Sequence, residues 1–530
     1  MTIRNLISIA AMASVTLFAQ APKFEAADVH RSAMNPYTFV SGGVLRGERY
    51  DLRKATVLDL IQIAYNVDPD VVLGGPNWLE FDQFDIAAKA PAGTSPATIR
   101  LMLQSLLTDR FHLVLHQDSR PIPAFALVVS KGKPKLTEAM GDGNAGCEYQ
   151  PQPAASTFTA VACRKMTMQA FAEWLRGAAG DYLASPVADA TRIDGSWDFD
   201  LKWHGRARSL PGGVERVTIF KAVERQLGLS LAPQNAPAPV LVIDSVNERP
   251  TENVPDIAKK LPRRDIEFEV ADLKPSSPGE PGAGMRVTPG GGFEARAVDM
   301  RILLGAAWDM DWSHINERFA PLPKWVSSAR FDINAKASTN TNSPPVRGWG
   351  YMDDDVRLML RALLIDRFKI KYELENRPVT AYSLAPGKVK MKPGNPAVRA
   401  SCKTARTIAN DPRDLNPRLA ELLDCRNVTM AEFAAALQPL APNNFAYPVE
   451  DATGLGGRWD FMLSYTPAWM LTAPAPQTAA IGDSTAASDP GGGISLAEAI
   501  SKQLGLKLEM RKRMLPVVVI DHIEEKPTPN

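Results

Sequence analysis

The sequence has few of the residues on which hydrolytic and metal chemistry depend. Its 530 residues include six histidines and four cysteines. The Gly-x-Ser-x-Gly turn of many serine hydrolases is absent, as are the His-Glu-x-x-His and Cys-x-x-Cys spacings of zinc sites. The sequence therefore predicts no catalytic residue, no metal ligand and no bound cofactor.

Charge of one sign and long apolar runs are also missing. Sixty Lys and Arg oppose 59 Asp and Glu, a formal net charge of +1. Without an overall field, we expect no nucleic acid partner and no attraction to an anionic membrane. Beyond the N-terminus no apolar run reaches the roughly 20 residues of a membrane-spanning helix, so no integral membrane segment is expected after signal cleavage.

Residues 1–21 have the order of a secretory signal peptide. Arg4 gives a basic start, an apolar run extends from Leu6 to Phe18, and the small residues Ala19 and Ala21 follow. The prediction is a periplasmic or secreted protein. A retained anchor is the alternative, and the cleavage site is left open.

After this segment the sequence repeats itself. The Phe-Glu-x-Ala-Asp motif at Phe24 returns at Phe268, and Leu-Leu-x-Asp-Arg-Phe at Leu106 returns at Leu363. Such a period sets the unit of the fold. It predicts two homologous domains, 22–250 and 265–530, joined by a linker at 251–264. A stretch at about 467–493, rich in Ala, Pro, Ser and Gly, is interpreted as a loop insertion in the second copy.

Hydrophobic periodicity within each copy alternates between helical stripes and strands. The order helix, strand, strand occurs twice per copy, which predicts four related units. Helices packed on small mixed sheets place the chain in the α+β class. The Arg120-Pro121 and Arg377-Pro378 pairs are predicted to turn the chain between the two strands of a hairpin, with 111–115 pairing with 124–129 in the first copy.

The four cysteines fall two per copy, Cys147 and Cys163, then Cys402 and Cys425. Cys163-Arg164 precedes Met166-Thr167-Met168 just as Cys425-Arg426 precedes Val428-Thr429-Met430. Cys163 and Cys425 therefore occupy equivalent positions in the two copies. We predict one disulfide within each copy. Closing loops of this size contributes on the order of 3 kcal/mol by constraining the unfolded chain.

These motifs together resemble a soil-associated family of secreted bacterial proteins with a domain of unknown function, here in two tandem copies. The resemblance also rests on Gly74-Gly75-Pro76-Asn77-Trp78 and Gln226-Leu227-Gly228-Leu229. It implies export and no established activity. The second copy departs from the pattern, with Ala320-Pro321-Leu322-Pro323-Lys324-Trp325 in place of the Gly-Gly-Pro loop. More distantly, the units are similar to the short N-terminal domains of secretins and TonB-dependent receptors, an analogy of fold alone.

The best shared polar features are two Asp-Arg pairs and two tryptophans. Arg110 and Arg367 are candidate ligand contacts because a guanidinium can bind a carboxylate with two hydrogen bonds. The structural alternative is that they satisfy the last carbonyls of a helix. Trp78 and Trp325 are candidate platforms for a ligand, and core packing explains them equally well.

Other polar groups have structural interpretations. His112 and His116 are predicted to share the solvated face of a strand. Four aspartates could form acid-base pairs, but their context favours a turn followed by a strand. These are Asp189, Asp198, Asp451 and Asp460.

The sequence thus favours an exported, non-catalytic interaction or ligand-binding protein of the bacterial envelope. The alternative is a secreted hydrolase of polymeric substrates, for which His204 and His314 are the available bases. The partner is unknown, and an envelope protein is the candidate. Oligomeric state, any catalytic activity and a division of labour between the copies stay open.

Overall fold

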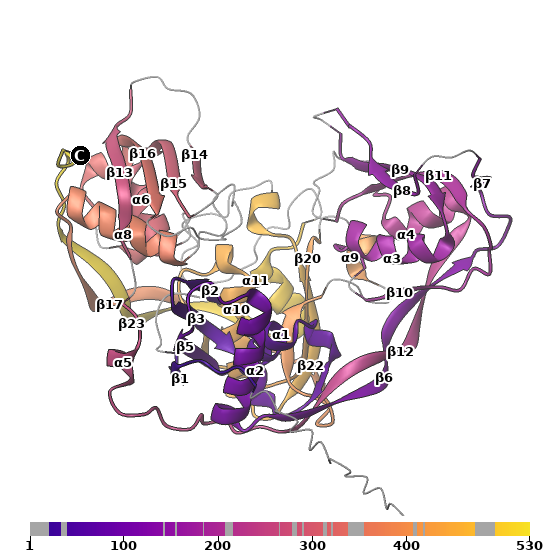
Figure 1. Ribbon diagram of the computed structural model, residues 1–530, viewed down its shortest axis with the longest axis horizontal. Helices are drawn as coiled ribbons and strands as arrows, with labels where there is room; N and C mark the ends of the chain where they lie inside the picture. The colour runs from indigo at the N-terminus through magenta and orange to yellow at the C-terminus, as the bar shows by residue number, and fades with distance from the viewer. Residues whose placement is uncertain are drawn as a thin grey trace, which may run out of the picture.

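The computed structural model describes most of the chain (Figure 1). The described residues are 21–32, 40–140, 144–153, 156–183, 185–206, 216–263, 266–277, 284–288, 291–310, 315–319, 322–337, 354–405, 411–416, 419–471 and 493–529. The predicted signal peptide lies outside them except for its last residue, as do His314 and most of the predicted insertion. No helix in these ranges is both long and apolar enough to span a membrane.

Four small units, each with its own sheet and hydrophobic core, make up this part of the chain. The four sheets share one strand order, in which the first strand lies beside the fourth, then the third, then the second. This arrangement confirms the α+β class and the repeat of related units. Each unit, however, has a four-stranded sheet rather than the two strands of the predicted helix, strand, strand order. The additional pair of strands precedes the predicted helix, and the hydrophobic periodicity did not resolve it.

Units 1 and 3 begin the two copies. The elements of unit 1 are β1 (Ala26–Arg31), β2 (Ser41–Arg46), β3 (Arg49–Thr56), α1 (Val57–Tyr65), β4 (Val72–Gly74), β5 (Gln83–Lys89) and α2 (Pro96–Phe111). Those of unit 3 are β13 (Phe268–Pro275), β14 (Gly284–Val287), β15 (Phe293–Asp299), α6 (Met300–Ala307), α7 (Ile315–Arg318), β16 (Arg330–Ala337) and α8 (Asp354–Arg367).

Units 2 and 4 complete the copies. The elements of unit 2 are β7 (Thr137–Glu138), β8 (Gly146–Tyr149), β9 (Phe158–Met166), α3 (Met168–Ala178), β10 (Val187–Asp189), β11 (Trp197–His204) and α4 (Ile219–Ala222). Those of unit 4 are β18 (Lys392–Pro393), β19 (Ser401–Thr404), α9 (Pro412–Leu415), β20 (Glu421–Val428), α10 (Met430–Leu440), β21 (Glu450–Asp451), β22 (Trp459–Tyr465) and α11 (Leu496–Ala499). A π-helical turn and a left-handed glycine, Gly228 or Gly505, end α4 and α11.

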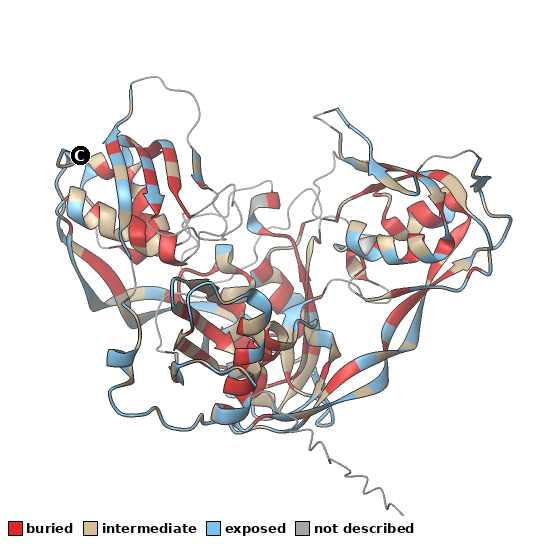
Figure 2. Cartoon of the chain, viewed as in Figure 1, coloured by how far each residue is buried: buried red, intermediate tan, exposed pale blue. Residues whose placement is uncertain are grey.

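The helix after the third strand starts in the same way in every unit. Thr56, Thr167, Asp299 and Thr429 are the N-caps, and each side chain accepts a backbone N–H three residues later. This bond satisfies one of the donors that a helix start leaves open. The helices then bury one apolar face on their sheets, so that buried residues concentrate inside the units (Figure 2).

Two long ribbons join the units of each copy. β6 (Val114–Val129) pairs antiparallel with β12 (Leu229–Ser245), and β17 (Lys371–Ala385) pairs with β23 (Lys507–His522). The predicted hairpins at Arg120-Pro121 and Arg377-Pro378 are therefore wrong. Proline is compatible with extended backbone and lacks only the N–H, so at the middle of a ribbon between two cores it does not turn the chain.

The start of each predicted strand is also corrected. Phe111 is the last residue of α2, and His112 follows as its cap with a φ of 50°. Lys369 has the same left-handed backbone after Phe368, and β17 starts at Lys371. The alternating run at 111–115 therefore covers a helix end and only the first two residues of β6.

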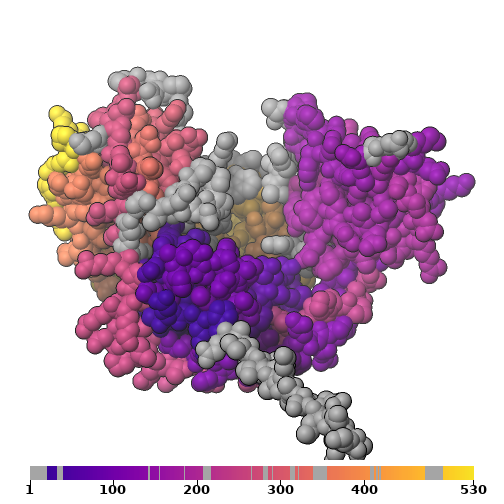
Figure 3. Space-filling view, viewed as in Figure 1, coloured from indigo at the N-terminus to yellow at the C-terminus, as the bar shows by residue number. Residues whose placement is uncertain are grey.

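Units 1 and 4 lie together at the centre, and units 2 and 3 lie at opposite ends of the long axis (Figures 1 and 3). The first copy thus places its second unit on one wing, and the second copy places its first unit on the other. Contacts between the copies hold unit 1 to units 3 and 4, including the ion pair of Arg46 with Asp355. A short helix of unit 4, α9, reaches unit 2.

Candidate functional site

The aspartates of the Phe-Asp-Ile and Trp-Asp-Phe motifs have one structural role in all four units. Each accepts the backbone N–H of a left-handed residue at an irregularity in the third strand, where φ is 48–53°. The donors and acceptors are Lys54 and Asp85, Lys165 and Asp198, Ala297 and Asp332, and Asn427 and Asp460, at 2.6–2.9 Å. These carboxylates stabilise bulged strands, which does not favour an acid-base role for Asp198 or Asp460.

Asp189 and Asp451 close the predicted turns. Each carboxylate accepts the backbone N–H and the hydroxyl of the threonine two residues later, at 2.7–2.9 Å. Such a local bond is the usual reason that Asp begins a turn. The threonine hydroxyl in turn accepts the N–H of Ile193 or Leu455.

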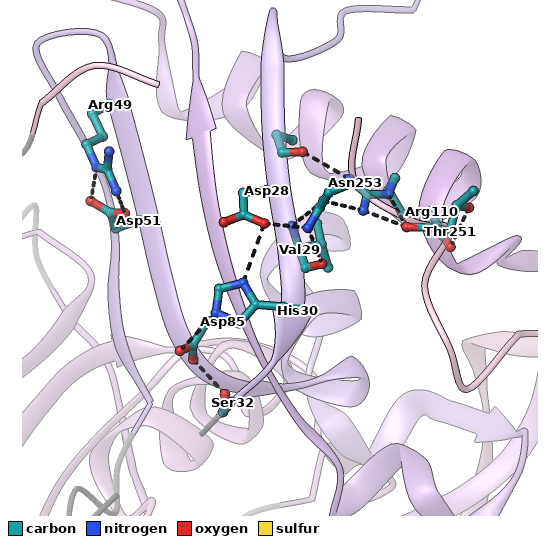
Figure 4. Close-up of polar contacts among 11 residues, drawn as sticks. Asp28, Val29, His30, Ser32, Arg49, Asp51, Asp85, Arg110, Thr251 and Asn253 are labelled. Carbon is teal, nitrogen blue, oxygen red and sulfur yellow. Dashed lines mark hydrogen bonds and ion pairs between the residues drawn. The ribbon is translucent and has the colours of Figure 1, made fainter. Parts of the chain in front are cut away.

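Arg110 fastens the segment that follows the first copy to unit 1 (Figure 4). Its guanidinium donates to the carbonyls of Ala27 and Thr251 and to Oδ1 of Asn253, at 2.6–3.1 Å. Arg367 reaches the carbonyls of Ala271, Thr528 and Pro529 at the corresponding place in the second copy. Both arginines therefore bind the chain's own backbone, and their contact with a ligand stays a prediction.

The open face of the unit 1 sheet gathers polar side chains beside this anchor (Figure 4). His30 lies 3.5 Å from Asp28 and 3.8 Å from Asp85, distances too long for strong hydrogen bonds. Asp28 accepts from Asn253, and Asp85 accepts from Ser32. Because structural donors already hold both carboxylates, this group offers a charged surface rather than an acid-base pair.

The open face of unit 3 repeats the charges and is hollowed. Its hollow, of about 390 Å³, is lined by Asp272, Lys274, Arg286, Glu294, Arg296 and Asp332, together with less polar neighbours. On unit 1 the segment predicted to be the linker reaches the corresponding face, where Arg49 donates to the carbonyl of Pro262 at 2.6 Å. The same face of the domain therefore contacts polypeptide in one copy and is exposed in the other.

The two candidate tryptophans lie in short 3₁₀ turns, Trp78 in Asn77–Glu80 and Trp325 in Lys324–Ser327. Each is partly buried and packs against the core of its own unit. A ligand platform at either residue stays a prediction.

The Gly74–Asn77 loop of unit 1 contacts the second copy at Arg399, a residue that the sequence analysis did not single out. The Arg399 guanidinium donates to the carbonyls of Gly74 and Val72 at 2.7 and 3.1 Å and lies 3.3 Å from the Glu80 carboxylate. The backbone N–H of Ala400 donates to Oδ1 of Asn77 at 2.8 Å.

Further contacts surround this arginine. Lys403 pairs with Asp70, and the Phe81 ring packs against the core of unit 4. Burial raises the pKa of Glu80, and the opposing charge of Arg399 does not fully offset it. A signal in the sequence is a difference between the copies, because Lys324 and Ser327 stand where unit 1 has Asn77 and Glu80.

A second contact between the copies is a buried ionic group. Asp411 accepts from Arg413 at 2.6 Å and pairs with Arg206 of unit 2 at 3.1 Å, and all three side chains are at most 7% exposed. Burial alone would raise the pKa of Asp411, but hydrogen bonds from Arg413 and the charge of Arg206 lower it. The guanidinium of Arg206 also lies over the Tyr182 ring, 4.3 Å from its centroid.

His204, the described base of the hydrolase alternative, is fully buried beside this group. Its Nδ1 accepts the backbone N–H of Val217 at 3.0 Å, and the Phe158 ring lies 3.9 Å away. Burial and the charge of Arg216 lower its pKa, so the ring is neutral and its proton is on Nε2. No lone pair then remains on either nitrogen to accept a proton from a nucleophile.

Both predicted disulfides are confirmed. Cys147 bonds Cys163, and Cys402 bonds Cys425, each across neighbouring antiparallel strands. His116 pairs with Asp244 at 2.9 Å across the first ribbon. Among the described residues, no three side chains of His, Cys, Asp or Glu are grouped to hold a metal ion.

The fold and its contacts define a tandem α+β protein whose shared polar residues hold its own chain together. A family model described as a protein of unknown function (DUF3738) matches residues 58–246 and 301–523, more than half of the chain, and the protein belongs to this family. The two matched regions confirm a domain of unknown function in two copies. No curated protein and no solved structure matches. The likeness to secretin and TonB-receptor domains therefore stays a prediction.

Proposed function

We propose that this chain is an exported interaction protein of the bacterial envelope. The observation that carries the proposal is the contact at Arg399, where one copy of the domain recognises the other through two backbone carbonyls, an amide side chain and a carboxylate. A domain that binds a relative in this way has a surface suited to other proteins. The disulfides are compatible with an oxidising compartment, which supports export.

The exposed face of unit 3 supports a binding role at a second place. Three cations and three anions line its hollow, so an extended polypeptide or a zwitterionic ligand would find partners of both signs. On the equivalent face of unit 1, Arg49 donates a hydrogen bond to the carbonyl of Pro262, so this face already binds a peptide carbonyl. Of the two bases of the hydrolase alternative, His204 does not support it, because it is held as a backbone acceptor, and His314 lies outside the described residues.

Site-specific photo-crosslinking of the exported full-length chain tests the proposal. A photoreactive residue at Asn334, on the open face of unit 3, is expected to give a discrete adduct with an envelope protein. The matched control is Asn376, which is also exposed but lies on the middle of a ribbon. An identical adduct pattern at the two positions, or no adduct at either, would refute an interaction role for this face.

A further inference from the structure

The sheet of unit 1 already binds a segment of polypeptide on its open side (Figure 4). The Asn253 side chain bonds both backbone groups of Val29, at 3.0 and 3.1 Å, on the outer edge of β1. Arg49, on β3 of the same sheet, donates to the carbonyl of Pro262. The residues between these two contacts include α5 (Ile257–Lys260), which packs against β1. The open face of this domain is therefore able to hold a stretch of chain that crosses it.

The corresponding face of unit 3 is more exposed and has different side chains. Asn334 is exposed, whereas Ala87, at the same position of unit 1, is partly buried. Gly292 stands where unit 1 has Arg49, so the guanidinium that binds a peptide carbonyl on unit 1 is missing. A partner of unit 3 must therefore be held by other groups, and these line its hollow of about 390 Å³.

The three carboxylates in this hollow already have partners. Asp332 accepts the Ser276 hydroxyl at 2.6 Å, in addition to the backbone N–H of the bulged strand. Glu294 pairs with Arg286 on the neighbouring strand at 2.5 Å. Asp272 is engaged as well. A cationic group of a ligand would therefore have to compete with bonds that the protein makes itself.

Two cations of the hollow are different, because they flank Asp332 without a bond to it. Lys274 lies opposite Asp332 on β13, and Arg296 lies on the other side, in the bulge of β15. Both are exposed, and neither charged group makes a hydrogen bond or an ion pair within the described ranges. Burial raises the pKa of Asp332, but its hydrogen bonds and the charges of Lys274 and Arg296 lower it overall. One negative charge thus lies between two positive ones.

We propose that the hollow of unit 3 binds an acidic segment of a partner polypeptide, with one carboxylate between Lys274 and Arg296. This inference rests on the proposed interaction function and names the chemistry of its partner. The segment held on unit 1 argues for polypeptide as the occupant, and the two cations argue for an acidic side chain. The volume lies at the lower end of the roughly 300–1,000 Å³ of ligand sites, which fits one side chain with its flanking backbone.

Fluorescence anisotropy with labelled peptides and the mature full-length protein tests the inference. The probe is a peptide of about ten residues that alternates Glu and Thr, so that its carboxylates share one side of the extended chain. Wild type should bind it roughly tenfold or more tightly than the Gln-Thr peptide of the same length. Free glutarate, a dicarboxylate without a peptide backbone, should compete only at concentrations on the order of 100-fold higher.

Substitutions locate the site. Lys274→Gln and Arg296→Gln should each weaken binding of the Glu-Thr peptide by roughly threefold to fivefold, because a single exposed ion pair contributes little. The double substitution Lys274→Glu and Arg296→Glu should reverse the preference, so that a Lys-Thr peptide binds more tightly than the Glu-Thr peptide. A misfolded variant would bind neither peptide. The control is Lys202→Gln, which removes an exposed lysine from β11 of unit 2 and should leave binding unchanged.

Four results would overturn the acidic-peptide site. They are no binding of the Glu-Thr peptide, equal binding of the Gln-Thr peptide, equal competition by glutarate, and an unchanged preference in the charge-reversed variant. The Asn334 adduct distinguishes this failure from that of the proposed function. An adduct that forms equally in wild type and in the charge-reversed variant would preserve the interaction with an envelope protein and reject its acidic character.

Discussion

Replacing Arg399 by alanine should release unit 4 from unit 1 while leaving both units folded. The substitution removes two charge-assisted hydrogen bonds to carbonyls and leaves Glu80 without its counter-charge. Breaking a mostly buried pair costs about 3–5 kcal/mol. The side chains of Arg399 and Glu80 are 12% and 15% exposed, so water can partly replace the lost contacts. We therefore expect the interface to lose about 3 kcal/mol of free energy.

Hydrogen exchange at Ala400 measures this loss where it occurs. Its backbone N–H donates to Asn77 across the interface, so it exchanges when the copies separate locally. A loss of about 3 kcal/mol corresponds to exchange faster by on the order of 100-fold. The free energy of global unfolding is a poorer measure, because a chain of several units need not unfold in two states.

Lys403→Ala is the matched control at the same interface. Its ion pair with Asp70 is half exposed on both sides, and such a pair contributes at most about 1 kcal/mol. Exchange at Ala400 should therefore change by less than about tenfold. Equal protection of Ala400 in the Arg399→Ala variant and wild type would refute the central role that we assign to this arginine, and so would equal effects of the two substitutions.

Further substitutions test the other structural roles. Asp85→Ala should lower stability by about 1–3 kcal/mol in thermal unfolding because it strands a backbone donor, whereas the exposed Asp200→Ala should have no measurable effect. Removing the Cys402–Cys425 disulfide should lower the free energy of unfolding by roughly 3 kcal/mol and should also speed hydrogen exchange at the interface between the copies. Removing Cys147–Cys163 should leave exchange at this interface unchanged. The pKa of Asp411 lies below the ordinary 3.8, so its stabilising effect is complete above that value and lost as pH falls through the lower folded pKa. Asp411→Asn should abolish this acid-dependent difference in unfolding measured from pH 5 downward.

The sequence predicts those features of the fold that depend on residues close to one another in the chain or on the repeat. Hydrophobic periodicity acts over a few residues, and the repeat places the cysteines at equivalent positions, so the alternation of helices and strands and both disulfides could be predicted. The ribbons could not, because a proline pair is a turn signal in isolation. In this chain it lies in extended backbone whose direction is set by a strand more than 100 residues away, with Pro121 opposite Pro237.

The four aspartates that support the bulged strands have a recognisable sequence context, but that context takes the form of two different motifs. Asp198 and Asp460 share a Trp-Asp-Phe motif, and Asp85 and Asp332 share a Phe-Asp-Ile motif, so a comparison of the two copies links the aspartates in pairs but does not link all four. All four follow an aromatic residue and precede an apolar one. That pattern fits a buried strand whose outward carboxylate supports a neighbour, and the left-handed residue that it caps has no fixed identity, since it is Lys, Ala or Asn.

The interface at Arg399 could not be predicted from the sequence for a different reason. A repeat shows what two copies share, but a contact between copies depends on what they do not share. If both loops had Glu80 and both edges had Arg399, every loop could bind every edge, and the chain could pair with itself in several ways. Replacing these residues by Ser327 in one copy and Asn144 in the other leaves a single complementary pair at the centre. The residues that differ between the copies are therefore the first to examine for function in this domain, ahead of the motifs that repeat.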